Sequence, residues 1–411
     1  MSPADLAGPE PEAVAGTDAT LAVHAARLLG DGRARGVPVS EPIVQTANFL
    51  LDEASVADLA SSGGARTYSY TRLANPTIES AARVVAALEG AEDAVVTSSG
   101  MAAITASLLA LTPPGGRILT VHEIHGESSY LMRAHLEPLG FQVTSVPLAA
   151  LGRPEGFADQ APDVVYVETL SNPMLRVADV AAISASAHRV DALCVVDDTF
   201  TTPVNAKPLA LGADLVVASA TKYLNGHSDV IAGVSCGSKR LVARVRDHVA
   251  ATGCSPDPFA AYLLLRGLKT LPLRVSRQNA TALRLATELQ ASPDVEMVAY
   301  PFLSDHPDHE LARSVLAGGG GIVTARLEGG DERAHEFERH LRIIQPATSL
   351  GGVESVVCIP AETSHLSLSD EERFGLGILP GSLRFSFGIE DPDDLWGDLG
   401  QALEHSRAGP T

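Results

Sequence analysis

Cysteine, positive charge and long apolar runs are all scarce in this chain of 411 residues. Its four cysteines, Cys194, Cys236, Cys254 and Cys358, are far apart and form no C-x-x-C pair. The wide spacing of the cysteines excludes a disulfide framework, and we predict no cysteine nucleophile. The same spacing is expected of reduced thiols in a cytoplasmic protein. The chain has thirty Lys and Arg and fifty Asp and Glu, which gives a formal charge of −20. This negative charge argues against a nucleic-acid or anionic-membrane partner.

No apolar stretch approaches the roughly 20 residues that span a bilayer, so no membrane span is predicted. Residues 1–20 lack both a cationic start and an apolar segment, which excludes a secretory signal and indicates a disordered tail. The chain is long enough for two domains. We expect an N-terminal tail and extended arm (1–65), a first domain (66–260) and a C-terminal domain (261–411).

Strand-like and helix-like segments alternate along most of the chain. This alternation is typical of an α/β fold, here a large, mostly parallel sheet with helices on both faces, followed by a smaller α/β domain. The run 318–321 of four glycines is predicted to be a flexible turn. The predicted strands are 94–97, 118–121, 164–168, 193–197, 215–219 and 322–327, and the predicted helices are 21–29, 77–89, 101–111, 128–139, 177–188, 260–268, 274–290 and 333–341.

The segment 214–228 is the most informative stretch. An apolar strand ends at Ser219, Thr221 and Lys222, where two hydroxyls could hold a phosphate while the amine meets a carbonyl carbon. A lysine that carries pyridoxal phosphate as a Schiff base needs this arrangement. A solvated lysine after a core strand is the plain alternative. Ser219 to Lys222 also fits the S-x-x-K motif of serine acyl enzymes, but the S-D-N and K-T-G elements of that class do not occur.

The segment resembles the lysine signature of the pyridoxal-phosphate enzymes of cysteine and methionine metabolism, such as cystathionine γ-synthase, cystathionine γ-lyase and methionine γ-lyase. Further matching blocks include Tyr-Ser-Tyr-Thr-Arg-Leu-Ala-Asn-Pro-Thr (68–77), Asp-Asp-Thr-Phe-Thr-Thr-Pro (197–203) and Leu-Arg-Phe-Ser-Phe-Gly-Ile-Glu-Asp (383–391). The resemblance covers roughly residues 40 to 405. It implies a fold-type I transferase and a homotetramer, a dimer of dimers whose active sites are shared between two subunits. The remaining blocks are 99–103, 168–173, 263–271 and 349–355.

The cofactor makes separate demands on its binding residues. A protonated ring nitrogen needs a desolvated carboxylate, and Asp197 ends an apolar strand where such a partner belongs. The phosphate needs backbone amides at a helix start, which Gly100 and Met101 can offer. Hydroxyls of Ser219 and Thr221 are expected on its other side.

The resemblance assigns further residues. Tyr70 and Arg72 are expected to reach the phosphate of the adjacent subunit. Arg384 is expected to bind the carboxylate of an amino-acid substrate, for which a planar guanidinium is suited. Asn172 and the backbone around Ser349 are expected to assist it.

The chain departs from the family pattern at several positions. His125 replaces the tyrosine that stacks on the cofactor ring and helps to protonate the leaving group in the family. Imidazole can also stack on the ring, and it ordinarily titrates near neutral pH. His125 is therefore expected to cover the ring and to act as the acid. Alternatively, the leaving group needs no proton. Asp198 stands where the family usually carries Asn, and neutral Thr348 argues against a substrate with a cationic tail. No metal is predicted, because His122, Glu123 and His125 lack zinc-site spacing.

The resemblance thus implies γ-elimination or γ-replacement on an amino acid with a γ-leaving group: a homoserine ester, a sulfur amino acid or a halogenated one. Lys222 would act through a Schiff base and a vinylglycine-type intermediate. Two alternatives stay open within the family, β-elimination of the cystathionine β-lyase kind and a specialised lyase with a non-standard substrate. A cofactor-binding protein without turnover is a further alternative, disfavoured by the presence of Lys222, Asp197 and Arg384.

Overall fold

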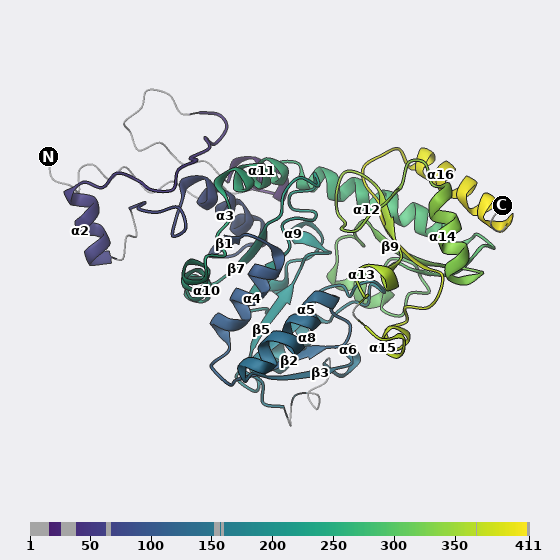
Figure 1. Ribbon diagram of the computed structural model, residues 1–411, viewed down its shortest axis with the longest axis horizontal. Coiled ribbons are helices and arrows are strands. Elements are labelled where there is room, and N and C mark those ends of the chain that lie inside the picture. Colours follow the sequence, from purple (N-terminus) through teal and green to yellow (C-terminus); the bar gives the residue numbers. More distant parts are fainter. Residues whose placement is uncertain are drawn as a thin grey trace.

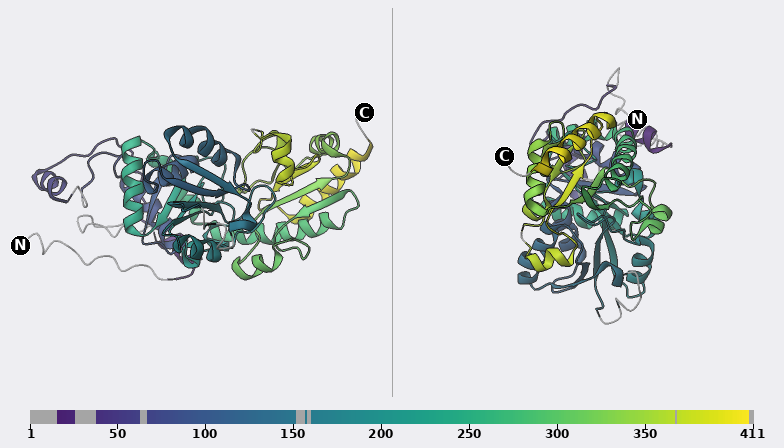
Figure 2. Two further views of the ribbon diagram at one scale, coloured as in Figure 1. Left: turned by 90° about the horizontal axis from the view of Figure 1, so that it is seen from below. Right: turned by 90° about the vertical axis from the view of Figure 1, so that its right-hand side faces the viewer.

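The computed structural model describes residues 16–25, 38–62, 67–151, 157, 160–366 and 368–408. Most of the predicted tail, residues 1–15, lies outside the described residues, as do 26–37 and 63–66 of the predicted arm. The helix predicted at 21–29 begins earlier, as α1 (Asp18–His24), and residues 26–29 are not described. Residues 38–62, called the arm below, carry α2 (Glu53–Ser62) and project from the body of the molecule (Figures 1 and 2).

The larger sheet has seven strands in the order β1-β7-β6-β5-β4-β2-β3. Every neighbouring pair is parallel except the two that involve β7. The predicted mostly parallel sheet is therefore confirmed, although the sequence did not reveal β3, a half-exposed edge strand, or the short glycine-bounded β7. The strands are β1 (Asp93–Thr97), β2 (Arg117–Val121), β3 (Gln142–Val146), β4 (Val164–Glu168), β5 (Leu193–Asp197), β6 (Leu215–Ala218) and β7 (Gly233–Gly237).

Helices cover both faces of this sheet (Figure 1). Along β6, Val216 and Ala218 pack into the buried cluster that contains α3 (Pro76–Glu89), whereas Leu215 and Val217 pack with α4 (Gly100–Leu111) and α10 (Lys239–Thr252). Successive side chains of a strand point to opposite faces, so a strand covered on both sides must be apolar throughout. This explains why the strands appear in the sequence as short uninterrupted apolar runs.

The smaller sheet has five strands in the order β10-β11-β12-β9-β8. The long helix α12 (Leu271–Gln290) reaches it from the region of the larger sheet, and α14 (Gly330–His340) and α16 (Pro392–His405) pack beside it (Figure 1). One cluster of buried side chains continues from α3 through α12 into this sheet. Its strands are β8 (Val295–Ala299), β9 (Ile322–Leu327), β10 (Gln345–Pro346), β11 (Val356–Cys358) and β12 (Ser382–Ser386).

Some predicted segments differ in the structure. The predicted helix 128–139 is divided into α5 (Gly126–Tyr130), a π-helical turn and a 3-10 turn that contains a proline. The predicted flexible turn at 318–321 is wrong, because these glycines are buried and a Cβ on Gly319 would meet the Tyr300 ring at 2.5 Å. Helices not yet named are α6 (Leu148–Leu151), α8 (Val180–His188), α9 (Thr202–Asn205), α11 (Pro258–Leu268), α13 (His309–Val315) and α15 (Asp370–Gly375).

Candidate active site

The strands β1, β2, β4, β5 and β6 run in the same direction, so their carboxyl ends meet at one edge of the sheet. Ligands of open α/β sheets bind at this edge. A cavity of about 440 Å³ lies here, and residues of the C-terminal region complete its wall. All candidate residues except Tyr70 and Arg72 line it: Gly100, Met101, His125, Asn172, Asp197, Ser219, Thr221, Lys222, Ser349 and Arg384.

Lys222 lies in the turn that follows β6. Its backbone is held by hydrogen bonds from the Lys222 amide to the Ser219 carbonyl (3.1 Å) and from the Gly226 amide to the Lys222 carbonyl (2.8 Å). The side-chain amine donates a hydrogen bond to Ser349 Oγ at 2.7 Å. Burial, and secondarily the charge of Arg384, lowers the Lys222 pKa to about 8. The amine is therefore partly neutral, and nucleophilic, near neutral pH.

Asp197 ends β5 and is 8% exposed. Its Oδ1 accepts hydrogen bonds from the Thr199 amide (2.9 Å) and hydroxyl (2.5 Å), and its Oδ2 accepts one from the Tyr166 hydroxyl at 3.1 Å. The Thr199 hydroxyl also accepts a hydrogen bond from the Ser219 amide at 2.8 Å. Burial raises the pKa of Asp197, and the Thr199 hydrogen bonds oppose that shift. The carboxylate is thus desolvated but positioned, as a partner for a protonated ring nitrogen must be.

A cradle suited to phosphate lies between the start of α4 and the turn after β6. The side chain of Ser99 caps α4 by accepting a hydrogen bond from the Ala102 amide at 3.0 Å, and the first amides of a helix have no intrahelical partner. A Cβ on Gly100 would lie 2.7 Å from Ser219 Cβ, so only glycine allows this close approach. Thr221 also lines the cavity, but its hydroxyl exchanges hydrogen bonds with the Ala232 backbone.

Arg384 comes from β12 in the smaller sheet and is 4% exposed. Its Nη1 donates to Asn172 Oδ1 at 3.0 Å, and its Nη2 donates to the Ser349 carbonyl at 3.1 Å. Its Nε is buried without a hydrogen-bond partner among the described residues. A buried guanidinium with an unsatisfied donor has capacity to bind a carboxylate.

His125 precedes α5, and its amide donates a hydrogen bond to Glu168 Oε1 at 2.6 Å. A Cβ on Gly126 would lie 2.5 Å from the Ser364 carbonyl, so the chain after His125 packs closely against the C-terminal region. Burial, then Arg384 and Lys222, lowers the His125 pKa to about 4. The expectation that His125 titrates near neutral pH is therefore wrong; its imidazole is neutral there and retains a single N–H.

Tyr70 and Arg72 lie apart from this cavity. Tyr70 is 45% exposed, and the Arg72 guanidinium lies over its ring, 5.5 Å from the centroid. Arg72 donates a hydrogen bond to the Ala250 carbonyl at 2.5 Å and lines a different cavity next to the arm. A contribution from these side chains to a cofactor site therefore requires a second chain.

Several neighbours of the site were not predicted individually. Tyr166 and Glu168 lie on β4, and Thr199 follows Asp197 in the block 197–203, which was the sequence signal available for it. His122 Nδ1 pairs with Ser145 Oγ at 2.7 Å, and Glu123 accepts a hydrogen bond from the Leu148 amide at 2.9 Å. The side chains of His122 and Glu123 thus bond to the neighbouring strand β3 and the start of α6.

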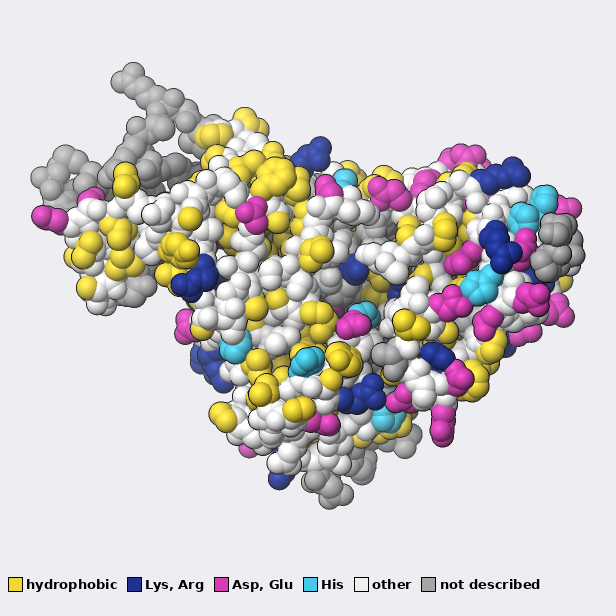
Figure 3. Space-filling model, viewed as in Figure 1, with side chains coloured by type: hydrophobic (Ala, Val, Ile, Leu, Met, Phe, Trp, Pro, Cys, Tyr) yellow, Lys and Arg dark blue, Asp and Glu magenta, His cyan; other side chains and the backbone are white. Residues whose placement is uncertain are grey.

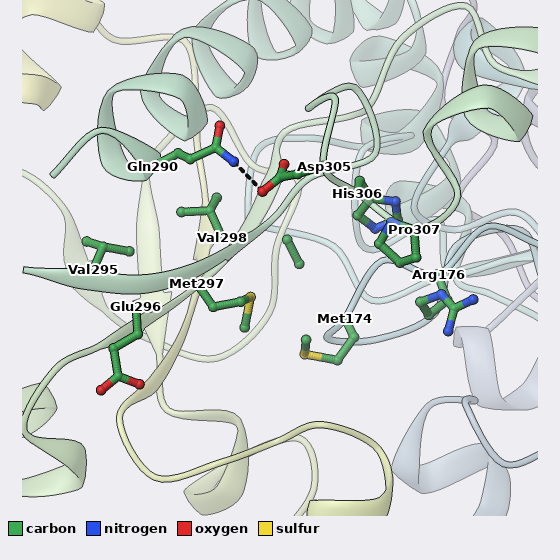
Figure 4. Close-up of a pocket in the computed structure, with 11 residues that line it drawn as sticks. Met174, Arg176, Gln290, Val295, Glu296, Met297, Val298, Asp305, His306 and Pro307 are labelled. Atoms are coloured by element: carbon green, nitrogen blue, oxygen red, sulfur yellow. Dashed lines mark hydrogen bonds between the residues drawn. The ribbon is translucent and has the colours of Figure 1, made fainter. Parts of the chain in front are cut away.

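A further cavity, of about 290 Å³, lies beside β8 (Figure 4). Three of its polar side chains are paired: Gln290 with Asp305 (2.5 Å), Arg176 with Asp308 (2.6 Å) and Glu296 with Arg326 (2.7 Å). His306 Nε2 is buried without a hydrogen-bond partner among the described residues. No lysine is among the described residues that line it. The reactive groups converge in the cavity at the carboxyl ends of the strands and not here.

The fold and the cavity at the carboxyl ends of the strands are those of an enzyme that binds pyridoxal phosphate, since a desolvated amine, a buried carboxylate, the amides of a helix start and a buried arginine meet in one place. Residues 19–404 match the model of a family described as Cys/Met metabolism PLP-dependent enzyme. The chain belongs to that family. The alternative interpretation as a serine acyl enzyme is therefore wrong.

Named relatives agree with this family. The chain is 42% identical over 390 residues to cystathionine γ-synthase 1, chloroplastic, of Arabidopsis thaliana, covering 94% of this chain and 69% of the relative. It is 38% identical to L-methionine γ-lyase of Pseudomonas putida, covering 94% and 97%. A crystal structure of cystathionine γ-synthase from Xanthomonas oryzae pv. oryzae, in complex with aminoacrylate and cysteine, matches with a TM-score of 0.88 and 38% identity, covering 96% of this chain and 100% of that one. The chain is a pyridoxal-phosphate-dependent enzyme of the cystathionine γ-synthase and γ-lyase type.

No helix among the described residues is both long and apolar enough to cross a membrane.

Proposed function

We propose that the enzyme catalyses γ-elimination or γ-replacement on an amino acid with a γ-leaving group, such as a homoserine ester, a sulfur amino acid or a halogenated amino acid. One observation supports this most directly: the desolvated Lys222 amine, the Asp197 carboxylate and the Arg384 guanidinium line the same cavity. Relatives named γ-synthase, γ-lyase and O-succinylhomoserine sulfhydrylase favour chemistry at the γ-carbon.

When bound, pyridoxal phosphate supplies an aldehyde for an amine and a ring that withdraws electrons from the adjacent carbon. Lys222 is the amine that would hold it between turnovers. Once displaced by the substrate, the same amine can take the α-proton, since a pKa of about 8 leaves it partly unprotonated near neutral pH. Asp197 would keep the ring nitrogen protonated, and the amides of Gly100 and Met101 with the Ser219 hydroxyl would hold the phosphate.

Arg384 would orient the substrate by binding its carboxylate, with Asn172 and the Ser349 carbonyl holding the guanidinium in place. His125 would stack on the cofactor as a neutral ring. Because its pKa is held near 4, a cationic His125 is not the proton donor of this mechanism at neutral pH. This favours leaving groups that depart without a strong acid, such as an acyloxy group or a halide.

We also propose a homotetramer, a dimer of dimers, in which Tyr70 and Arg72 complete the site of the adjacent subunit. Large apolar side chains on the arm support an assembly: Val39 is 90% exposed and Leu50 is 102% exposed. Ile231, which lines the cavity, is 71% exposed. Yellow side chains accordingly gather over the arm in Figure 3. A second copy that covers them would bring Tyr70 and Arg72 to the site they lack within one chain.

The proposal extends to domains and location. Residues 1–65 form the tail and arm, 66–260 the cofactor-binding domain, and 261–411 the substrate-binding domain. Four free cysteines, three of them buried, support a cytoplasmic enzyme of amino-acid metabolism.

The test is a substrate screen of the purified enzyme loaded with pyridoxal phosphate. Methionine, cystathionine, O-succinylhomoserine and a γ-halogenated amino acid are each assayed for 2-oxoacid release, with and without cysteine as nucleophile, and Lys222→Ala serves as control. We expect turnover of at least one γ-substituted substrate by the native enzyme and none by the variant. Turnover confined to β-substituted amino acids would replace γ-chemistry by β-elimination.

A further inference from the structure

Asp198 lies directly behind Asp197 and is 1% exposed. Its Oδ1 accepts hydrogen bonds from the hydroxyls of Thr169 (2.7 Å) and Thr201. Its Oδ2 is buried and has no hydrogen-bond partner within the described part of the chain. Because successive residues point to opposite sides of an extended chain, Asp198 faces away from the ring-facing carboxylate and into the protein.

Glu89, the last residue of α3, is 4% exposed and lies near enough to Asp198 to be affected by its charge. Burial and then the charge of Asp198 raise the pKa of Glu89 well above its usual range. Glu89 Oε2 is likewise buried without a partner among the residues described. The charge of Asp198 therefore acts on Glu89, and each of these buried acids has one unsatisfied oxygen, which is the pattern expected when at least one of them is protonated.

The other groups that face this pair are few. Lys207 contributes a positive charge, but its amine also bonds to Asp18 Oδ1 at 2.8 Å and to the Leu88 carbonyl. Asp18 adds a negative charge, and the buried Cys236 thiol has its pKa raised by burial and by both acids. Negative groups thus outnumber positive ones in a buried place, and full ionisation is unfavourable.

We propose that Asp198 is a positioning residue of the active site: with Glu89 it holds a proton behind Asp197, and so makes the field at the ring-facing carboxylate respond to pH near neutrality. Asparagine, which the family usually carries at this position, cannot lose a proton. The device is therefore expected in this chain and absent from relatives with asparagine. It rests on the proposed role of Asp197.

The consequence follows from electrostatics. Burial raises the pKa of Asp198 to about 7, against the hydrogen bonds from Thr201 and Thr169. Below that pH the Asp198 carboxyl is neutral and Asp197 carries the only charge of the two. Above it a second negative charge appears behind Asp197, which strengthens proton binding by the ring nitrogen that Asp197 faces. The visible spectrum of the bound cofactor should therefore contain a pH-dependent step that belongs to Asp198.

The test uses holoenzyme of the native chain and of Asp198→Asn, Glu89→Gln and Asp398→Asn, between about pH 5.5 and about pH 8.5. Infrared difference spectra report the carbonyl stretch of a protonated carboxyl, and visible absorbance reports the cofactor. We expect the native protein to lose a carboxyl band and change its visible spectrum together near pH 7, and Asp198→Asn to do neither. Glu89→Gln should leave the step near pH 7, because the charge of Asp198 keeps the Glu89 carboxyl protonated while Asp198 titrates.

Asp398→Asn is the matched control, since Asp398 is a buried carboxyl of α16 that accepts hydrogen bonds from the amides of Arg342, Ile343 and Ile344. It should lose stability and retain both pH-dependent signals. Identical pH profiles for the native protein and Asp198→Asn would overturn the proposal. Neither signal requires a substrate, so the result stands whether or not the proposed γ-substrates are turned over.

Discussion

Replacing Gly100 by alanine tests the phosphate cradle, because the structure defines what the added methyl group meets. The new Cβ would lie 2.7 Å from Ser219 Cβ and 3.0 Å from its Cα and Oγ. Carbon atoms in contact are ordinarily about 3.5–4.0 Å apart, so the gap must widen by roughly 0.8–1.3 Å. Ser219 cannot retreat freely, since its amide is bonded to the Thr199 hydroxyl at 2.8 Å.

The expected loss has two parts. Overpacking costs about 1–3 kcal/mol of folding free energy. Moving the α4 amides away from Ser219 removes at least one hydrogen bond to the phosphate, worth about 1.5–3 kcal/mol for a charged group. Since about 1.4 kcal/mol corresponds to tenfold in affinity, Gly100→Ala should bind pyridoxal phosphate about 10- to 150-fold more weakly.

The assay is titration of apoenzyme with cofactor, followed by absorbance, alongside chemical unfolding of the apoenzyme. Gly397→Ala is the control, because Gly397 lies in α16 with nothing within 4 Å of its added Cβ. This change should stabilise the protein by about 0.5–1 kcal/mol and leave cofactor affinity unchanged. Native cofactor affinity in Gly100→Ala would refute the placement of the phosphate between α4 and Ser219.

Further predictions concern four other side chains. Arg384→Lys keeps the charge but not the planar fork, so kcat/KM should fall about 10- to 150-fold with cofactor affinity unchanged; an unchanged kcat/KM would contradict carboxylate binding. Lys222→Ala should abolish borohydride labelling of the chain by cofactor, measured by peptide mapping. His125→Tyr should gain turnover of ordinary sulfur substrates in a side-by-side screen, and identical activities would rule out His125 as the specificity switch. The Asp198 pKa is raised from 3.8 to about 7, so its stabilising contribution is complete below about pH 4 and is lost as pH rises toward 7; urea unfolding across this range should show a flatter pH dependence for Asp198→Asn.

Local sequence was sufficient for the residues at the ends of strands. Each strand that is covered on both faces must be a short apolar run. The polar residues at the end of such a run lie at the edge of the sheet where ligands bind, and these residues include Asp197, Ser219 and Lys222. Gly100 was predicted in the same way, from a capping serine followed by a helical pattern. These positions depend on interactions within a few residues along the chain.

Other features depend on segments that are distant in the sequence. The guanidinium of Arg384 reaches the cavity because β12 pairs with β9 in the smaller sheet, and its position there rests on Asn172 and Ser349. The sequence did not predict that β7 is an antiparallel strand or that the glycines at 318–321 are buried. Their composition indicates a turn, and they belong to the core only because other segments pack against them.

The sequence by itself determined the family and the cofactor and predicted the reactive amine, because those depend on residue types at fixed local spacing. The tertiary structure alone decided which groups share one buried environment, and hence their charge. His125 is neutral at physiological pH because burial, Arg384 and Lys222 act on it together. The charge of Asp198 acts on Glu89 because α3 packs against the larger sheet. Desolvation and proximity set these proton affinities, and neither exists until the chain has folded.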